Sequence, residues 1–243
     1  MNLAFTLLDW QASAPGLNEP EHWQNWAMQP PVIDSTQQLA KCSQLPMMTA
    51  RRLNSGSRSA VDCGLSVMRR QPVDALVFTS RHGELERNLR ILTALAKQQN
   101  LSPTDFAMSV HNAAVGSLTI AAEAPLVSTS LSAGVDSFQQ GMVEVAALHA
   151  AGYHHVLLVD FDGTIPDIYH PHIPELTLFS AYAVALLLAP GDACQCVSQP
   201  QATPGASSAL PQSLLFLHGW LARQAHFSVP GDRLHWRWAC RYD

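Results

Sequence analysis

The chain has 243 residues, of which 47% are hydrophobic and 14% are charged. This composition supports a substantial buried core and excludes a chain that is disordered in bulk. The formal net charge is −5, and lysine and arginine are scattered rather than gathered in a stripe, which argues against nucleic acid as the main partner. No apolar run approaches the roughly 18 residues of a spanning helix, so we expect no membrane span.

The N-terminal segment, residues 2–11, has the pattern of a first strand. Its apolar part, LAFTLL, is short, and no lysine or arginine precedes Lys41, so we expect no secretory signal. A Trp- and Pro-rich segment follows as far as Pro31. We expect this segment to be irregular.

Residues 45–99 predict a turn, a helix, a strand and a second helix. The strand is the apolar run DALVFTS at residues 74–80, and the second helix covers residues 85–99. Apolar residues at helical spacing are Ala60, Cys63, Leu65 and Val67 in the first helix and Leu89, Leu92, Leu95 and Ala96 in the second.

Residues 125–164 contain a complete strand–turn–helix–strand unit. Residues 125–130 predict a short buried strand, residues 132–134 a small-residue elbow, and residues 135–151 a helix that Gly152 ends. One side of this helix carries Phe138, Met142, Val145 and His149. The next run, HVLLVDF at residues 155–161, is typical of a central parallel strand. We therefore predict an α/β fold built on a parallel sheet.

The C-terminal part has a different composition. Residues 199–212 are rich in Pro, Ala and Ser and read as a linker. After it we predict one amphipathic helix at residues 213–224 and an edge strand at residues 234–242. His218, His226 and His235 lie in this tail, and we interpret them as structural or solvated.

The five cysteines show no framework spacing, which indicates reduced thiols and a cytoplasmic protein. Cys194 and Cys196 are separated by one residue, but no second ligand pair follows at zinc-finger spacing. We therefore interpret them as alternating residues of a strand, and we expect neither a metal nor another cofactor.

The elbow after residue 130 resembles that of a known enzyme family. Residues 129–134, Thr-Ser-Leu-Ser-Ala-Gly, are similar to the Thr-Ala-Cys-Ser-Ser-Gly elbow of the β-ketoacyl synthases in the thiolase-like superfamily. Leu131 stands where that family has its nucleophilic cysteine. A leucine side chain has no lone pair and no ionisable proton, so covalent acyl capture at this position is excluded. The resemblance implies the family's fold without its chemistry, and hence no catalytic residue.

A second stretch carries the same resemblance. Ketoacyl synthases have an Asn-x-x-x-Gly-x-Leu segment shortly before the nucleophile strand, and residues 112–118 read Asn-Ala-Ala-Val-Gly-Ser-Leu. In the family this helix lies at the dimer interface beside the acyl tunnel. We expect residues 110, 113, 114 and 117 to share one helical face. The resemblance implies these tunnel or interface candidates: Val110, His111, Asn112, Ala113, Ala114, Ser117 and Leu131.

The resemblance covers residues 1–190 and ends after Pro190. It also includes LPMMTARRL at residues 45–53, FTSRHGELERN at residues 78–88 and FSAYAVALLLAP at residues 179–190. It implies a thiolase-like fold reduced to one βαβαβ-type half. We expect residues 1–190 to form a ketoacyl-synthase N-terminal-like domain, and residues 191–243 to be a linker and tail packed on the same domain.

The nearest resemblance is to the short chain-length-factor subunits of aryl polyene and type II polyketide pathways. It implies a non-catalytic subunit that pairs as a heterodimer with a full-length β-ketoacyl synthase and shapes the acyl tunnel during polyketide or fatty-acyl elongation. It also implies contact with an acyl carrier protein through the complex. An exposed sheet edge and apolar helices would require such a partner.

A competing motif is VLLVDFDGT at residues 156–164. It matches the strand and Asp-x-Asp-Gly-Thr of haloacid-dehalogenase-like phosphohydrolases, which would make Asp160 the nucleophile and Asp162 the acid/base around Mg²⁺. That chemistry also needs a downstream lysine and a later pair of carboxylates. The chain has no lysine beyond Lys97, and its later acidic residues are isolated. The phosphohydrolase stays the alternative hypothesis.

Two weaker enzymatic interpretations remain. Residues 130–134 approximate a serine-hydrolase elbow, with Ser132 as nucleophile, Asp160 as orienting acid and His218 or His226 as base. The segment Arg-His-Gly-Glu at residues 81–84 has the composition of an acid/base cluster. We favour a tight turn for the first and a solvated loop for the second.

Overall fold

The protein folds around one mixed sheet, seen in a computed structural model that describes residues 1–173, 180–200 and 210–242. The described strands lie in the order β3-β2-β4-β5-β7-β6, and β1 also pairs with β5. Their bounds are β1 Asn2–Ser13, β2 Ala75–Thr79, β3 Val127–Leu131, β4 Val156–Asp162, β5 Tyr182–Pro200, β6 His226–Pro230 and β7 Leu234–Cys240.

The parallel part of the sheet consists of β3, β2 and β4, in which Val77 lies between Thr129 and Leu158. Successive residues of β2 point to opposite faces: Ala75 and Val77 join one buried cluster, while Leu76 and Phe78 join the other. A strand buried on both faces reads as a continuous apolar run, which is why the sequence predicted it. The predicted strands at residues 74–80 and 155–161 are confirmed.

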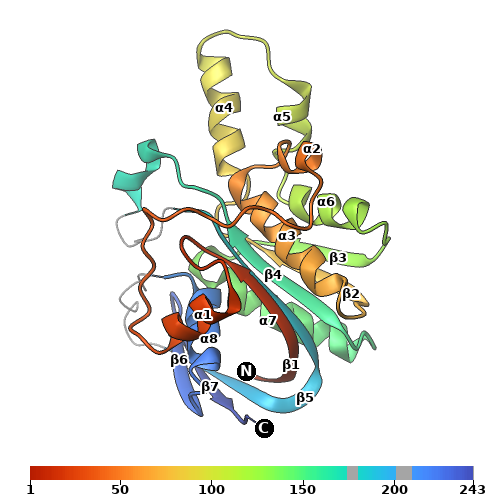
Figure 1. The fold of residues 1–243 in the computed structure, drawn as a ribbon, viewed down its shortest axis with the longest axis vertical. Coiled ribbons are helices and arrows are strands. Elements are labelled where there is room, and N and C mark those ends of the chain that lie inside the picture. The colour runs from red at the N-terminus through yellow and green to blue at the C-terminus, as the bar shows by residue number, and fades with distance from the viewer. Residues whose placement is uncertain (174–179, 201–209, 243) are drawn as a thin grey trace.

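Helices cover both faces of the sheet (Figure 1). On one face lie α3 (Ser55–Met68) and α6 (Ala113–Ala121), and on the other lie α7 (Ser137–Ala150) and α8 (Gln212–Leu221). Gly141 lets α7 approach the sheet, because a Cβ there would lie 2.6 Å from Thr79 Cγ2 and 2.9 Å from Leu158 Cδ1. The helix predicted after the elbow is confirmed, and its residues Phe138, Met142 and Val145 are buried.

The long strand β5 joins the two parts of the molecule. It pairs antiparallel with β4 over residues 182–188, with β1 along most of its length, and with β7 over residues 194–200. Pro190, where we placed the end of the first domain, lies inside this strand. The expected linker falls mostly at residues 201–209, outside the described residues.

One expectation about the C-terminal tail needs correction, and one of its strands was not predicted. The strand near the end, β7, is not an edge strand, because it lies between β5 and β6, and β6 itself had no clear sequence pattern. Trp236 and Trp238 of β7 are buried, and the Trp238 ring lies 4.6 Å from that of Phe216 on α8. Aromatic and polar residues therefore alternate along β7 because one face of this strand packs against α8.

Part of the Trp-rich segment near the N-terminus is helical, contrary to our expectation. Helix α1 (Pro20–Ala27) begins with a proline and buries Trp23 and Trp26. Trp26 packs edge-on against His218 of α8 with ring centroids 4.8 Å apart, and His218 Nε2 lies 2.7 Å from Gln29 O. His218 is therefore a structural residue, as predicted, and the helix forms because its tryptophans find a tertiary partner.

The expectation that all the cysteines are reduced thiols is wrong for one pair. Cys194 of β5 and Cys240 of β7 face each other in the strand register and form a disulfide. Cys42, Cys63 and Cys196 are free. The disulfide closes a loop of 46 residues and ties the last strand to the sheet. No helix in the described ranges is both long enough and apolar enough to span a bilayer.

Cys240→Ser should lower the free energy of unfolding by as much as about 4 kcal/mol, because a loop of this length loses that much chain entropy when it is closed in the unfolded state. Thermal unfolding with and without dithiothreitol measures this. The reductant should lower the melting temperature of the wild type and of the control Cys196→Ser, but not that of Cys240→Ser. A wild-type melting temperature that ignores the reductant would contradict the pairing.

Candidate functional site

The elbow lies between β3 and α7. Leu131 is the last residue of β3 and is half-buried, and Gly134 adopts a φ of +61° that opens a short 3-10 turn before the helix. The Ala133 N–H donates to Ser137 Oγ at 3.0 Å, and Ser137 Oγ donates to Gly134 O at 2.8 Å. The turn is thus held by its own backbone and one hydroxyl, and the side chain at residue 131 is aliphatic.

The serine-hydrolase interpretation is wrong, because its three groups are engaged elsewhere. Ser132 Oγ donates to Arg81 O at 3.4 Å, and His218 bonds the backbone of Gln29. His226 lies exposed on β6. No base is placed beside Ser132, so the hydroxyl belongs to the turn.

The acid/base cluster suggested at residues 81–84 is also not formed. Glu84 is buried and accepts hydrogen bonds from Ser57 and from Asn54 Nδ2. Burial raises the pKa of the Glu84 carboxyl. The His82 N–H donates to Asp162 Oδ1 at 2.8 Å. These contacts fasten the loop after β2 to the core. The loop is therefore neither an acid/base cluster nor the solvated loop that we favoured.

Asp160, the proposed phosphohydrolase nucleophile, is only 3% exposed. Thr79 Oγ1 donates to its Oδ1 at 2.5 Å, and Ser213 Oγ and Tyr182 OH donate to its Oδ2 at 2.5 and 3.2 Å. Burial, opposed by these hydroxyls, raises the pKa of Asp160 to about 7. A carboxylate enclosed in this way cannot reach a phosphate.

Asp162 is enclosed in the same manner. Its Oδ1 accepts from Ser80 Oγ at 2.6 Å, and its Oδ2 lies 3.3 Å from His82 Nδ1. Across residues 1–173, 180–200 and 210–242, no group of three or more His, Cys, Asp or Glu side chains is arranged to hold a metal ion. The structure therefore gives no support to the phosphohydrolase alternative, and Asp160 and Asp162 are structural carboxylates.

The predicted tunnel or interface candidates before the elbow divide into two sets. Ala113 and Ala114 are buried, and Ala114 packs into this chain's own core. Val110 and Asn112 are exposed and precede α6. The expectation of a single helical face is therefore wrong, because Val110 is not part of the helix and the two alanines point inward.

The remaining candidates are held by hydrogen bonds within the chain. His111 Nε2 lies 3.2 Å from Ser80 O, and Ser117 Oγ donates to Ala113 O at 2.7 Å. The open side of α6 carries Gly116, where an added Cβ would meet nothing within 4 Å, and Ile120, which is 79% exposed. That side is the one available to a partner.

Beside this helix, β3 forms an edge of the sheet within the described residues. β3 is the first strand in the order and pairs only with β2, and Val127 is 48% exposed. An exposed edge presents unpaired N–H and C=O groups to another chain. The predicted exposed edge is therefore present within the described part of the fold.

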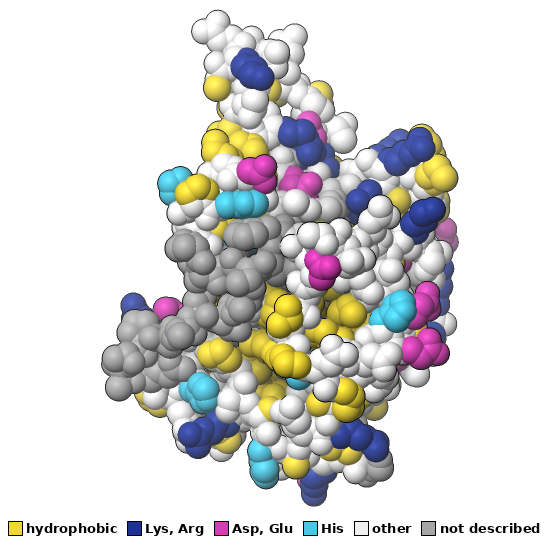
Figure 2. All heavy atoms as spheres, turned by 60° about the vertical axis from the view of Figure 1, so that its left-hand side comes forward, with side chains coloured by type: hydrophobic (Ala, Val, Ile, Leu, Met, Phe, Trp, Pro, Cys, Tyr) yellow, Lys and Arg dark blue, Asp and Glu magenta, His cyan; other side chains and the backbone are white. Residues whose placement is uncertain are grey.

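A helical hairpin of α4 (Leu85–Ala96) and α5 (Pro103–Ala107) projects from the same end of the molecule (Figures 1 and 2). Its base is polar: Arg87 is buried, bonds Asp105 Oδ1 at 2.5 Å and donates to Arg52 O at 2.9 Å. Its outer part is apolar and exposed, and Figure 2 shows hydrophobic side chains on this projection.

The exposed apolar side chains of the hairpin are Leu92, Leu95, Leu101 and Phe106. The sequence placed Leu92 and Leu95 at helical spacing without indicating what they face, and it did not single out Phe106. The helical spacing is confirmed, but no element among the described residues covers these four side chains. Apolar surface of this kind marks a protein interaction site.

The fold defines a thiolase-like α/β half, in which Leu131 ends the strand before the elbow. The family described as "Beta-ketoacyl synthase, N-terminal domain" matches residues 23–239. This chain therefore belongs to the β-ketoacyl synthase family, and the match continues well past Pro190, where we expected the resemblance to end.

Solved structures agree with this assignment. A chain in the structure of a ketosynthase (ApeO) in complex with its chain length factor (ApeC) from Xenorhabdus doucetiae is 56% identical, with a TM-score of 0.94 over 98% of this chain and 99% of that one. The ishigamide ketosynthase/chain length factor shares the fold at 9% identity, with a TM-score of 0.71 over 99% and 100% of the two chains. None of the curated proteins compared with this chain matches it.

One solved structure with a longer chain shares the fold. A β-ketoacyl synthase from Burkholderia phymatum STM815 is 12% identical, with a TM-score of 0.53 over 92% of this chain and 71% of that one. At this identity the likeness concerns the fold alone. The chain thus spans nearly all of the Xenorhabdus relative but only part of the longer synthase.

Asp160→Asn should flatten the dependence of stability on pH. The folded pKa is about 7 and the unfolded value about 3.9, so the native state holds the extra proton and wild-type stability falls as pH rises from about 4 through 7. Linkage gives a loss of about 3 kcal/mol between pH 5 and pH 8. Urea unfolding at both values should show this loss in the wild type and in the exposed control Asp232→Asn, but not in Asp160→Asn. Equal slopes in all three proteins would contradict the assignment.

Proposed function

We propose that this chain is a non-catalytic, chain-length-factor-like subunit that pairs with an active β-ketoacyl synthase and shapes the acyl tunnel during polyketide or fatty-acyl elongation. The 56% identical relative comes from a structure of a ketosynthase with its chain length factor, and this chain matches 99% of that relative's length. By the same inference the pair acts in the cytoplasm and meets an acyl carrier protein through the complex.

The observation that carries the proposal is Leu131 at the end of the edge strand. The elbow turns at Gly134, which has a positive φ, yet Leu131 offers no nucleophile. The tail histidines supply no substitute, because His218 is bound to the backbone and His226 lies on the outermost strand. A subunit with this elbow contributes surface rather than chemistry.

Assembly is supported by what the isolated chain leaves uncovered. Figure 1 shows β3 and α6 at the right of the molecule and the α4–α5 hairpin projecting above them, and Val127, Ile120 and the leucines of the hairpin are exposed there. Pairing β3 with a partner strand satisfies its backbone groups, and covering the leucines removes apolar surface from water at about 25 cal/mol per Å². Val110, His111, Asn112, Ser117 and Leu131 stay our candidates for the tunnel wall or interface.

We assign no contact with the partner to Ala113 and Ala114, because both are buried within this chain. Since Ala114 packs inside the chain, enlarging it would test the core rather than the contact with the partner. The edge strand offers the better test of assembly, because its exposed side chains have no packing role in the isolated chain.

Val127→Lys should abolish assembly with the co-expressed ketosynthase, because a charged edge blocks strand pairing and would be buried without a partner. The matched control is Val197→Lys, a strand valine of similar exposure, 41% against 48%, on β5. Size-exclusion chromatography should show the control co-eluting with the ketosynthase and Val127→Lys eluting alone. A Val127→Lys complex as stable as the wild type would refute the placement of the partner.

Leu131→Cys should restore a thiol but not condensation, since the elbow alone lacks the histidines that the resemblance assigns to the second half of a full synthase. The test pairs Leu131→Cys with a ketosynthase whose own nucleophilic cysteine is replaced by alanine, so that any product must arise on this chain. Intact-protein mass spectrometry should find no acyl adduct on the wild-type chain. A stable adduct there would show that this subunit is catalytic.

A further inference from the structure

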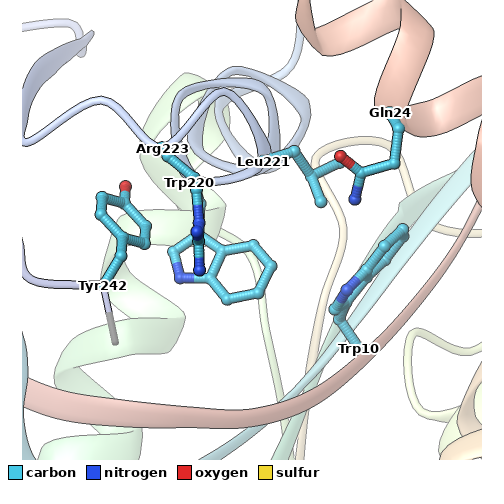
Figure 3. A pocket seen from close by; sticks show the side chains of 6 residues that line it. All are labelled: Trp10, Gln24, Trp220, Leu221, Arg223 and Tyr242. Atoms are coloured by element: carbon cyan, nitrogen blue, oxygen red, sulfur yellow. The ribbon is translucent and has the colours of Figure 1, made fainter.

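A pocket of about 440 Å³ lies between α1, α8, β1 and the C-terminal segment (Figure 3). Its lining residues are Trp10, Gln24, Trp220, Leu221, Arg223 and Tyr242. Strands β2 and β4 and the first part of β5 separate this region from β3, so the pocket is remote from the proposed partner surface. No feature of the proposed function uses it.

Three aromatic rings form the walls, and neighbouring contacts hold each of them in place. Trp10 packs edge-on against the buried Trp23 with centroids 6.2 Å apart. Trp220 and Tyr242 lie 6.4 Å apart, and Tyr242 OH donates to Gln224 O at 2.9 Å. The rings are therefore positioned before any ligand binds, which limits the entropy lost on binding.

The polar groups at the pocket are few and distinct. The guanidinium of Arg223 lies 5.8 Å from the centroid of the Tyr242 ring. Figure 3 shows the carboxamide of Gln24 directed toward the Trp10 side of the pocket. Within the described residues, neither this carboxamide nor the indole N–H of Trp10 or Trp220 has a hydrogen-bond partner. The pocket thus has donors that have no partner among the described residues, and the guanidinium of Arg223 adds a positive charge that also interacts elsewhere in the chain.

The aromatic walls and the guanidinium of Arg223 together favour one class of ligand. Aromatic walls alone would suit a flat ring or a cation, but the guanidinium of Arg223 repels a cation and attracts a carboxylate. Burial raises the pKa of the Tyr242 phenol, so this group is neutral near pH 7 and adds no opposing charge. Pockets of this size hold small organic molecules.

We propose that this pocket binds a planar aromatic carboxylate, with its rings between the indoles of Trp10 and Trp220 and its carboxylate at Arg223. The carboxamide of Gln24 supplies a further donor. Because the pocket belongs to this chain alone, binding is independent of the ketosynthase.

The test uses 2-naphthoate as probe, with 2-naphthamide as the neutral isostere and 2-naphthylmethylammonium as the cation. Indole N–H signals in two-dimensional NMR spectra of the ¹⁵N-labelled chain report binding directly, and Trp10→Phe and Trp220→Phe identify the two signals at the pocket. We expect 2-naphthoate to shift both signals with a dissociation constant below about 1 mM, the amide to bind more weakly, and the ammonium to bind least.

Arg223→Gln should weaken 2-naphthoate binding about tenfold and leave 2-naphthamide unchanged, because it removes only the charge-assisted contact. The matched control is Arg233→Gln, whose side chain is 90% exposed in the turn before β7 and should have no effect. Indole signals that do not move with 2-naphthoate, equal binding of the three probes, or an Arg223→Gln protein that binds like the wild type would each overturn the proposal.

Discussion

The buried carboxyl of Asp160 connects the separate parts of this molecule. It accepts hydrogen bonds from Thr79 on β2, Tyr182 on β5 and Ser213 on α8, while its own strand, β4, runs between β2 and β5. An isolated buried carboxyl is costly, and the hydroxyls compensate for the water it has lost. Because Ser213 lies in the first turn of α8, the same cluster also fixes where the tail helix begins on the sheet.

The position of α8 has consequences for the rest of the tail. Strand β5 continues beyond the parallel sheet and pairs with β7, so that Trp236 and Trp238 cover the tail helix. The helix in turn gives Trp26 of α1 a surface to pack on. The tail therefore completes the core on one face, and the family match that extends to residue 239 includes it.

The opposite end of the sheet is not completed in this way. Strand β3 has no second neighbour in the described fold, and the leucines of α4 face solvent. A chain that encloses one side and leaves apolar surface on the other is organised for a partner. The Asp-x-Asp motif also serves this interior: Asp160 and Asp162 both lie in the last part of β4, and they accept hydrogen bonds from buried hydroxyls rather than binding a phosphate.

Local pattern in the sequence was sufficient for the central elements. Continuous apolar runs identified β2 and β4, helical spacing identified α3, α4 and α7, and Leu131 at the elbow excluded a nucleophile, because all of these depend on neighbouring residues. The tertiary structure alone decided the rest. Several features depend on residues that are distant in the chain: helix α1, strand β6, the Cys194–Cys240 pair and the contact of Ser213 with Asp160. The exposure of Leu92 and Leu95 does so too. Local periodicity shows that a helix has an apolar stripe, but it does not show whether another element covers that stripe.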